Sequence, residues 1–148
     1  MGDLRSQSPS AVFQLIHEGE AAASLRRRSG QALSDEEVWD LVAYLWSTAT
    51  TPERVATGEA LYARNCAACH GETGGGDGPG GRYMEEQPTD FTDGRTMAGG
   101  SSEIYYAKIR RGGMGTGMPY WGTIFTEEET WGIVDYLWTF LFRDAETE

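Results

Sequence analysis

The sequence predicts an all-α fold, because its apolar residues recur at helical spacing and its breaks fall at glycine, proline and capping residues. Two stretches, Ser34–Glu37 and Thr126–Glu129, have the residues of a capping box, in which a hydroxyl and a glutamate three positions later satisfy free amide groups at a helix start. No stretch shows a convincing strand pattern of alternating apolar and polar residues. We therefore expect about five helices joined by glycine-rich loops.

Each expected helix is bounded by a cap, a glycine or a proline. The expected ranges are 11–19, 35 to about 50, 52–65, 102–111 and 127 to about 142. Residues 20–33 have no periodicity and are expected to form a loop, and residues 82–100 are expected to be irregular. The three arginines at 26–28 are either a solvated surface or a patch that docks a partner.

The composition indicates a folded and strongly acidic protein. The chain has 148 residues, of which 39% are hydrophobic, and its formal net charge is −11. This charge argues against nucleic acid and anionic membranes as partners. No apolar run reaches the length of a transmembrane helix. The length fits one domain with an extension.

Both cysteines lie in the motif Cys66-Ala67-Ala68-Cys69-His70, which reads C-x-x-C-H. This is the attachment motif of a c-type haem. The two thiols add across the two haem vinyl groups, and the spacing puts both sulfurs on one side of a helical turn. His70 then directs its imidazole at the iron. The motif therefore predicts one haem c, bound covalently through Cys66 and Cys69.

Three other interpretations of the motif were weighed against haem. A redox dithiol has the same C-x-x-C spacing, but it prefers a βαβ context that the sequence does not show. A zinc site of two cysteines and two histidines would need His17, the only other histidine, from a distant segment without finger-like spacing. The third interpretation is a chance occurrence of the motif.

Residues 71–81 follow the motif directly and contain seven glycines. They lack the G-K-[ST] ending of a phosphate-binding loop. A flexible linker is one interpretation. The position of the segment favours a loop that lies close against the haem, where side chains would clash.

From about Pro52 to Phe142 the chain resembles the class I c-type cytochromes of bacteria. Four features carry the resemblance, in the order of the family: a helix with Gly58 and Tyr62, the C-x-x-C-H motif, the loop Gly117-Met118-Pro119-Tyr120-Trp121, and a capped last helix with Trp131 and Tyr136. The resemblance implies a cytochrome c fold, in which about three to five helices surround the haem. It also implies that the first and last helices cross, with Gly58 and Tyr136 at the crossing.

The resemblance implies His70 as the proximal iron ligand and Met118 as the distal one. A thioether ligand stabilises ferrous iron and raises the potential relative to a second imidazole. The main rival is Met114, which has a similar glycine-rich setting, while Met84 and Met97 are further away in the sequence. Any methionine can also be core filler.

Three further residues are assigned to the haem site by the resemblance. Pro79 is similar to the family proline whose carbonyl accepts the Nδ1–H of the haem histidine. Trp121 and Phe91 are expected to pack on the haem or bind a propionate, and ordinary core packing is the alternative for both.

The segment 34–47 repeats the pattern of 126–139, with seven of fourteen positions identical, and 8–19 match 101–112 more weakly. Residues 1–50 therefore resemble the C-terminal half of a preceding cytochrome c domain, without a haem motif. Two capped amphipathic helices could also look alike by composition alone. We expect a haemless helical extension at 1–50, a monohaem domain at 51–143 and a polar tail at 144–148. Since Trp39, Tyr44 and Trp46 need burial, residues 35–47 should pack on the haem domain or on a partner.

These features predict an electron carrier and not an enzyme. A low-spin haem with His and Met ligands has no open site for a substrate, and it would shuttle electrons between redox proteins. The acidic charge favours partners with a basic docking face. The chain could be a free protein, or it could be a domain or subunit of a larger respiratory or photosynthetic complex associated with a membrane. The alternative function is a haem enzyme or gas sensor with an open or labile distal site.

Haem attachment implies a periplasmic or otherwise extracytoplasmic location. Residues 1–10 are polar and show no signal peptide, so we expect a mature protein or an excised domain.

Overall fold

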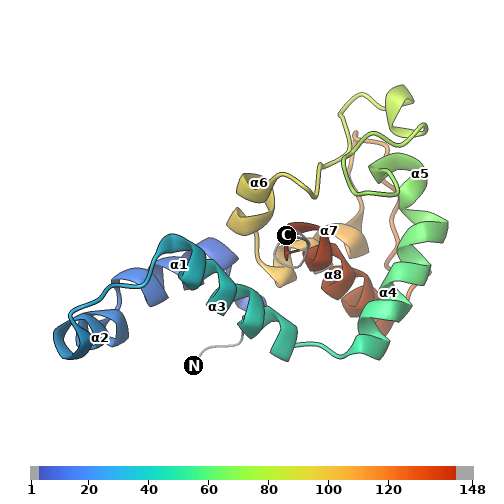
Figure 1. Ribbon diagram of the computed structural model, residues 1–148. Coiled ribbons are helices and arrows are strands. Elements are labelled where there is room, and N and C mark those ends of the chain that lie inside the picture. The colour runs from blue at the N-terminus through green and yellow to red at the C-terminus, as the bar shows by residue number, and fades with distance from the viewer. Residues whose placement is uncertain (1–3, 143–148) are drawn as a thin grey trace.

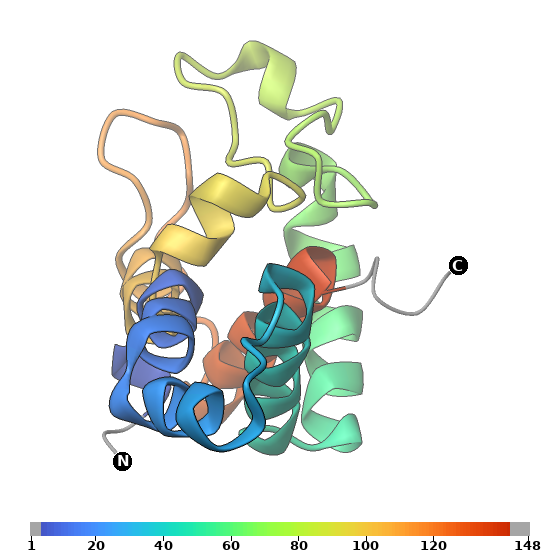
Figure 2. The same ribbon diagram turned by 60° about the vertical axis from the view of Figure 1, so that its left-hand side comes forward.

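The computed structural model describes residues 4–142, and the tail expected at 144–148 lies outside this range. Within the range all regular structure is helical, which confirms the all-α prediction (Figures 1 and 2). The elements are η1 (Leu4–Ser6), α1 (Pro9–Glu18), α2 (Glu20–Ser29), α3 (Asp35–Thr48), α4 (Pro52–Asn65), α5 (Ala67–His70), η2 (Gly81–Tyr83), α6 (Gly94–Gly99), α7 (Ser102–Arg111) and α8 (Glu127–Phe142). Among the described residues, no helix is both long and apolar enough to span a bilayer.

Both predicted capping boxes are confirmed. At the start of α3 the Glu37 N–H donates to Ser34 Oγ at 3.2 Å, and the Ser34 N–H donates to Glu37 Oε2 at 2.8 Å. Thr126 and Glu129 make the same two hydrogen bonds at the start of α8, at 3.2 and 2.8 Å. These reciprocal bonds fix where the two similar helices begin.

The loop predicted at 20–33 is wrong over most of its length, because the structure has helix α2 there. The segment has little apolar periodicity, but it is rich in alanine, leucine and arginine, which favour helix through their intrinsic propensity. Gly30 ends the helix in the left-handed conformation, with φ of 74°. The segment 82–100 also contains more structure than expected, since Asp93 caps the short helix α6.

The core of the fold is the crossing of α4 with α8, as the resemblance implies (Figure 1). A Cβ atom at Gly58 would lie 1.9 Å from the carbonyl oxygen of Gly132, so the two backbones touch and no larger residue fits between them. One turn further on, the buried ring of Tyr62 packs between Tyr136 and Phe140, with both ring centroids 5.3 Å away. The Tyr62 hydroxyl donates to the carbonyl of Gly71 at 2.8 Å, which ties the crossing to the chain just after the haem motif.

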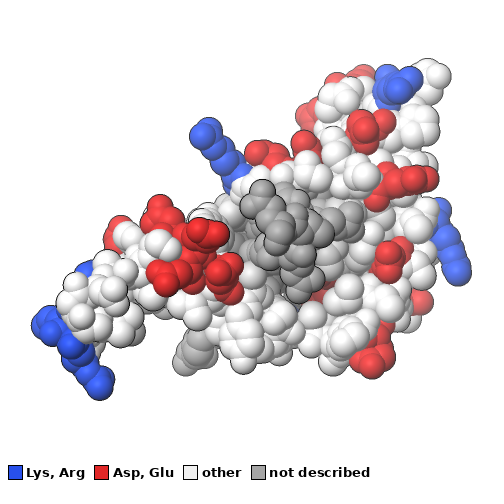
Figure 3. Space-filling view, in the orientation of Figure 1, with Lys and Arg blue, Asp and Glu red and all other residues white. Residues whose placement is uncertain are grey.

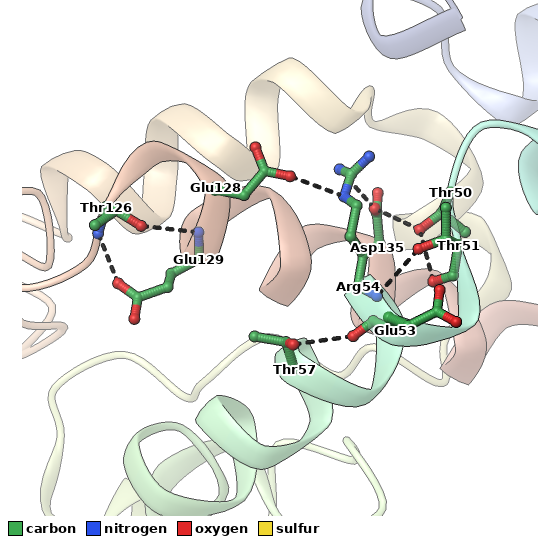
Figure 4. Close-up of polar contacts among 9 residues, drawn as sticks. All are labelled: Thr50, Thr51, Glu53, Arg54, Thr57, Thr126, Glu128, Glu129 and Asp135. Carbon is green, nitrogen blue, oxygen red and sulfur yellow. Dashed lines mark hydrogen bonds and ion pairs between the residues drawn. The ribbon is translucent and has the colours of Figure 1, made fainter.

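A polar cluster joins the segment between α3 and α4 to the last helix (Figure 4). The Thr50 hydroxyl donates to Asp135 Oδ2 at 2.6 Å, and Arg54 Nη2 lies 2.8 Å from the same oxygen. Burial raises the pKa of Asp135, although the Thr50 hydrogen bond and the Arg54 charge act in the opposite direction. The carboxylate therefore depends on both partners in its poorly hydrated position.

We expect Thr50→Val to lower the free energy of unfolding by about 1.5–3 kcal/mol, because it removes a hydrogen bond from a largely buried carboxylate. Urea denaturation followed by circular dichroism measures the change. Thr57→Val is the matched control, since the Thr57 hydroxyl bonds only to the Glu53 carbonyl of its own helix on an exposed face. Equal losses in the two variants would contradict a special role for Thr50.

The helix pairs α1–α3 and α7–α8 are built alike. Ser8 and Ser101 cap α1 and α7 through their hydroxyls, and Gly19 and Gly112 follow the two helices at corresponding positions. An aromatic pair joins the helices in each case: Phe13 and Trp39 have centroids 4.7 Å apart, and Tyr106 and Trp131 have centroids 4.3 Å apart.

Trp46 attaches α3 to α8. Its buried ring lies edge-on to Trp138, with centroids 5.7 Å apart. Trp39 is half-buried against α1, whereas Tyr44 stays 65% exposed. Packing within this chain therefore buries Trp46 and part of Trp39, while the expected burial of Tyr44 on a partner stays a prediction.

Candidate functional site

The haem motif is formed where α4 ends and the short helix α5 begins. Cys66 lies between the two helices, and the N–H groups of Cys69 and His70 both donate to its carbonyl, at 3.1 and 2.9 Å. These bonds wind the motif into one helical turn. The two thiols and the imidazole consequently line one cleft, as the spacing predicts.

The opposite side of this cleft comes from the loop between α7 and α8. Gly117, at φ of 83°, turns the chain into Met118, and the Gly113 N–H donates to the Met118 carbonyl at 3.1 Å. Met118 and Trp121 line the cleft together with Cys66, Cys69 and His70. Two thiols, one imidazole and the Met118 thioether are the donor set for a covalent haem with His and Met ligands, and Met84 brings a second thioether to the same cleft.

The enclosed part of the cleft has a volume of about 110 Å³. Cavities that bury a drug-sized ligand have roughly 300–1,000 Å³. The donor set fits the group, but the enclosed volume of the cleft is smaller than that range. The walls from Met84 to Thr89 and from Thr116 to Trp121 contain no regular helix and lie outside the α4–α8 crossing.

The described methionines fall into three environments. Met118 and Met84 line the cleft, Met97 is fully buried in the core, and Met114 is fully exposed. The rival named from the sequence, Met114, thus lies outside the cleft. Met84 lies inside it, although no motif pointed to Met84. An added Cβ at Gly117 would come within 3.4 Å of the Met84 sulfur, so the two loops touch there.

The carbonyl beside His70 belongs to Thr89, and the prediction for Pro79 is wrong on this point. His70 Nδ1 lies 3.1 Å from the Thr89 oxygen. Pro79 is exposed in a turn whose neighbours face α5: the Gly78 and Gly80 N–H groups donate to the carbonyls of Cys69 and Ala68. With Nδ1 held by a backbone carbonyl, Nε2 is the nitrogen left for a metal.

The glycine-rich loop packs against α5 and does not line the cleft, contrary to expectation. A Cβ at Gly78 would lie 2.6 Å from the Ala68 carbonyl oxygen, and one at Gly81 would lie 3.0 Å from the Cys69 carbonyl oxygen. The glycines therefore allow close approach to the backbone of the haem motif, and not to the haem cleft itself.

Phe91 and Trp121 occupy different positions around the site. Phe91 is buried and stacks on the His70 ring, with centroids 4.7 Å apart and an interplanar angle of 21°. It joins the imidazole to the aromatic core through Phe140. Trp121 lines the cleft and stacks on Phe125 at 5.1 Å. Phe91 can thus restrain the ligand ring, whereas Trp121 can contact a bound group.

The protonation properties of the motif argue against a redox dithiol. Burial raises the pKa of the Cys66 thiol to about 12, and the neighbouring Cys69 adds to the rise. Dithiol oxidoreductases lower the pKa of their attacking cysteine instead. Burial also lowers the pKa of His70, although the contact with Thr89 acts in the opposite direction, and this favours the neutral imidazole that binds iron.

A zinc site is not supported either. Between residues 4 and 142 no three side chains among histidine, cysteine, aspartate and glutamate gather as a metal cluster would. His17 lies instead beside Asp35, with Nε2 3.4 Å from the carboxylate.

The comparisons with known proteins agree with the geometry. The cytochrome c family profile matches residues 55–140. A solved structure from Kuenenia stuttgartiensis, a chain of its reducing HAO-like protein complex, has a similar fold, with a TM-score of 0.55 and 22% identity over 93% of this chain and 76% of that one. No curated protein matches the sequence. The family profile covers more than half of the chain and includes the haem motif, so the chain belongs to the cytochrome c family.

Proposed function

We propose that this protein is an electron carrier with one haem c, attached through Cys66 and Cys69 and ligated by His70 and Met118. Membership of the cytochrome c family implies haem-based electron transfer. The observation that carries the finer assignment is the single cleft lined by both cysteines, His70 and Met118. Met84 lines it too, and Met118 is assigned because it lies in the Gly117-Met118-Pro119 loop that resembles the family's ligand loop. When bound, the haem iron supplies a one-electron couple between its ferric and ferrous states.

The residues of the chain hold and restrain the site. Thr89 keeps Nδ1 of His70 in place through its carbonyl, and Phe91 limits rotation of the imidazole by stacking on it. The bond from the Gly113 N–H to the Met118 carbonyl shapes the loop that presents the thioether. A preorganised ligand pair changes little between oxidation states, which suits a carrier.

The proposal includes extracytoplasmic redox partners with basic docking faces. The net charge of −11 supports attraction to such faces. The similar chain from Kuenenia stuttgartiensis belongs to a protein complex, which supports a role of this chain as a subunit of a larger assembly.

We also propose that residues 1–50 derive from the C-terminal half of a preceding cytochrome c domain. The matching caps and aromatic pairs of α1–α3 and α7–α8 support this origin. The similar solved structure covers 93% of the chain, so its likeness extends into this segment.

The absorption spectrum of the purified protein, ferric and ferrous, with and without carbon monoxide, tests the carrier proposal. We expect a low-spin c-type ferrous spectrum, a weak far-red ferric band from the methionine sulfur, and no shift with carbon monoxide. A high-spin ferric spectrum with avid carbon monoxide binding would contradict the proposal and favour a haem enzyme or gas sensor.

A further inference from the structure

Helices α3 and α8 carry the same residue pattern, but one face of α3 is uncovered. Three pairs of corresponding positions are buried in both helices: Val38 and Thr130, Val42 and Val134, Trp46 and Trp138. The next face differs. Ile133 and Tyr136 are 1% and 7% exposed in α8, whereas their counterparts Leu41 and Tyr44 are 42% and 65% exposed in α3.

In α8 this second face is covered by α4. Gly58 of α4 meets the backbone of Gly132, and Tyr62 packs on Tyr136. The counterpart face of α3, formed by Leu41 and Tyr44 with Asp40 beside them, has the apolar residues of a helix crossing, but no helix among residues 4–142 buries it as α4 buries α8. We refer to these three residues as the α3 face.

The charge around the α3 face indicates what could cover it. Asp40 stands where α8 has Gly132, and α3 also carries Glu36 and Glu37 but no lysine or arginine, although Arg95 and Asp93 line the same pocket as Asp40. Acidic side chains gather on the surface over α1 and α3 (Figure 3). A second copy of this chain would bring the same acids together and would be repelled. A basic partner would instead be attracted.

We propose that the α3 face docks an amphipathic helix of a partner protein, which presents small and aliphatic residues to Leu41 and Tyr44 and a lysine or arginine to Asp40. The helix crosses α3 as α4 crosses α8. Because Asp40 has a side chain where Gly132 has none, the two backbones stay further apart than at the α4–α8 crossing. The basic residue then fills part of this space and pairs with the carboxylate.

The proposal rests on the similarity of α3 to α8 and on the exposure of Leu41 and Tyr44, and not on the ligation of the haem. Its failure would leave the carrier proposal intact, because the α3 face contains no residue of the haem cleft. Conversely, a failure of the carrier proposal would show in the spectrum and leave docking to α3 unaffected.

Isothermal titration of the full haem-loaded chain tests the docking. The probe is a helix-stapled peptide with the sequence of residues 52–65, which presents the face that covers α8, and in which Glu53 and Glu59 are both changed to lysine. We expect it to bind, and to bind more weakly as salt rises. Leu41→Ser combined with Tyr44→Ser should weaken binding roughly tenfold or more. Asp40→Asn should reduce the salt dependence.

Ile104→Ser is the matched control, since Ile104 is 59% exposed on α7 and lies outside the α3 face. It should bind the peptide as the native chain does, and all variants should keep the native haem spectrum. Absence of binding to the native chain would overturn the proposal, and so would equal binding by the double variant. If sedimentation analysis showed that the native chain is a dimer and the double variant a monomer, the proposal would also be overturned, because a second copy of the chain would then cover the α3 face.

Discussion

Met118→Ala is expected to leave the haem attached but to remove its distal ligand. The far-red ferric band should disappear, carbon monoxide should bind the ferrous protein, and the reduction potential should fall by on the order of 0.1 V, because the thioether favours ferrous iron. The expectation follows from the place of Met118 in the cleft that also holds His70 and both thiols. Absorption spectra and a redox titration measure the three effects.

Two other methionines provide matched controls for this prediction. Met114→Ala should leave the far-red ferric band and the reduction potential unchanged, because the Met114 side chain is fully exposed to solvent. Met84→Ala is the more demanding control, since Met84 also lines the cleft. It should keep the far-red band. If Met84→Ala lost the band and Met118→Ala kept it, the distal ligand would be Met84 and the assignment from sequence would be wrong.

Much of the fold could be predicted because residues close together in the sequence mark where its helices begin and end. The capping boxes at Ser34 and Thr126 are hydrogen bonds between residues three apart, so the sequence contains all of their geometry. Helix α2 was missed for the opposite reason. It has no strong apolar face to reveal it, and its stability comes from propensity and from the left-handed Gly30 at its end.

The site could be predicted as far as it is local. The C-x-x-C-H motif fixes Cys66, Cys69 and His70 on one turn through hydrogen bonds within five residues. The partner of His70 Nδ1 could not be found in this way, because Thr89 lies nineteen residues along the chain and reaches the ring only through the path of an irregular loop. The presence of Met84 in the cleft has the same cause: two loops distant in sequence meet there.

Gly58→Ala is expected to lower the free energy of unfolding by about 3 kcal/mol, although alanine is the better helix former. The added Cβ would lie 1.9 Å from the Gly132 carbonyl oxygen, so α4 and α8 must separate along their crossing. That separation would loosen the packing of Tyr62 on Tyr136 and Phe140, and with it the hydrogen bond from Tyr62 to Gly71 beside the haem motif. Urea denaturation of the haem-loaded protein measures the loss.

Gly99→Ala separates this effect from helix propensity. Gly99 also lies in a helix, at the end of α6, and an added Cβ there meets no atom within 4 Å. Its free energy of unfolding should stay within about 0.5 kcal/mol of the native value. If Gly58→Ala proved equally neutral, the two helices would have room to move apart, and the close contact of Gly58 with Gly132 would not be what holds the haem motif against the last helix.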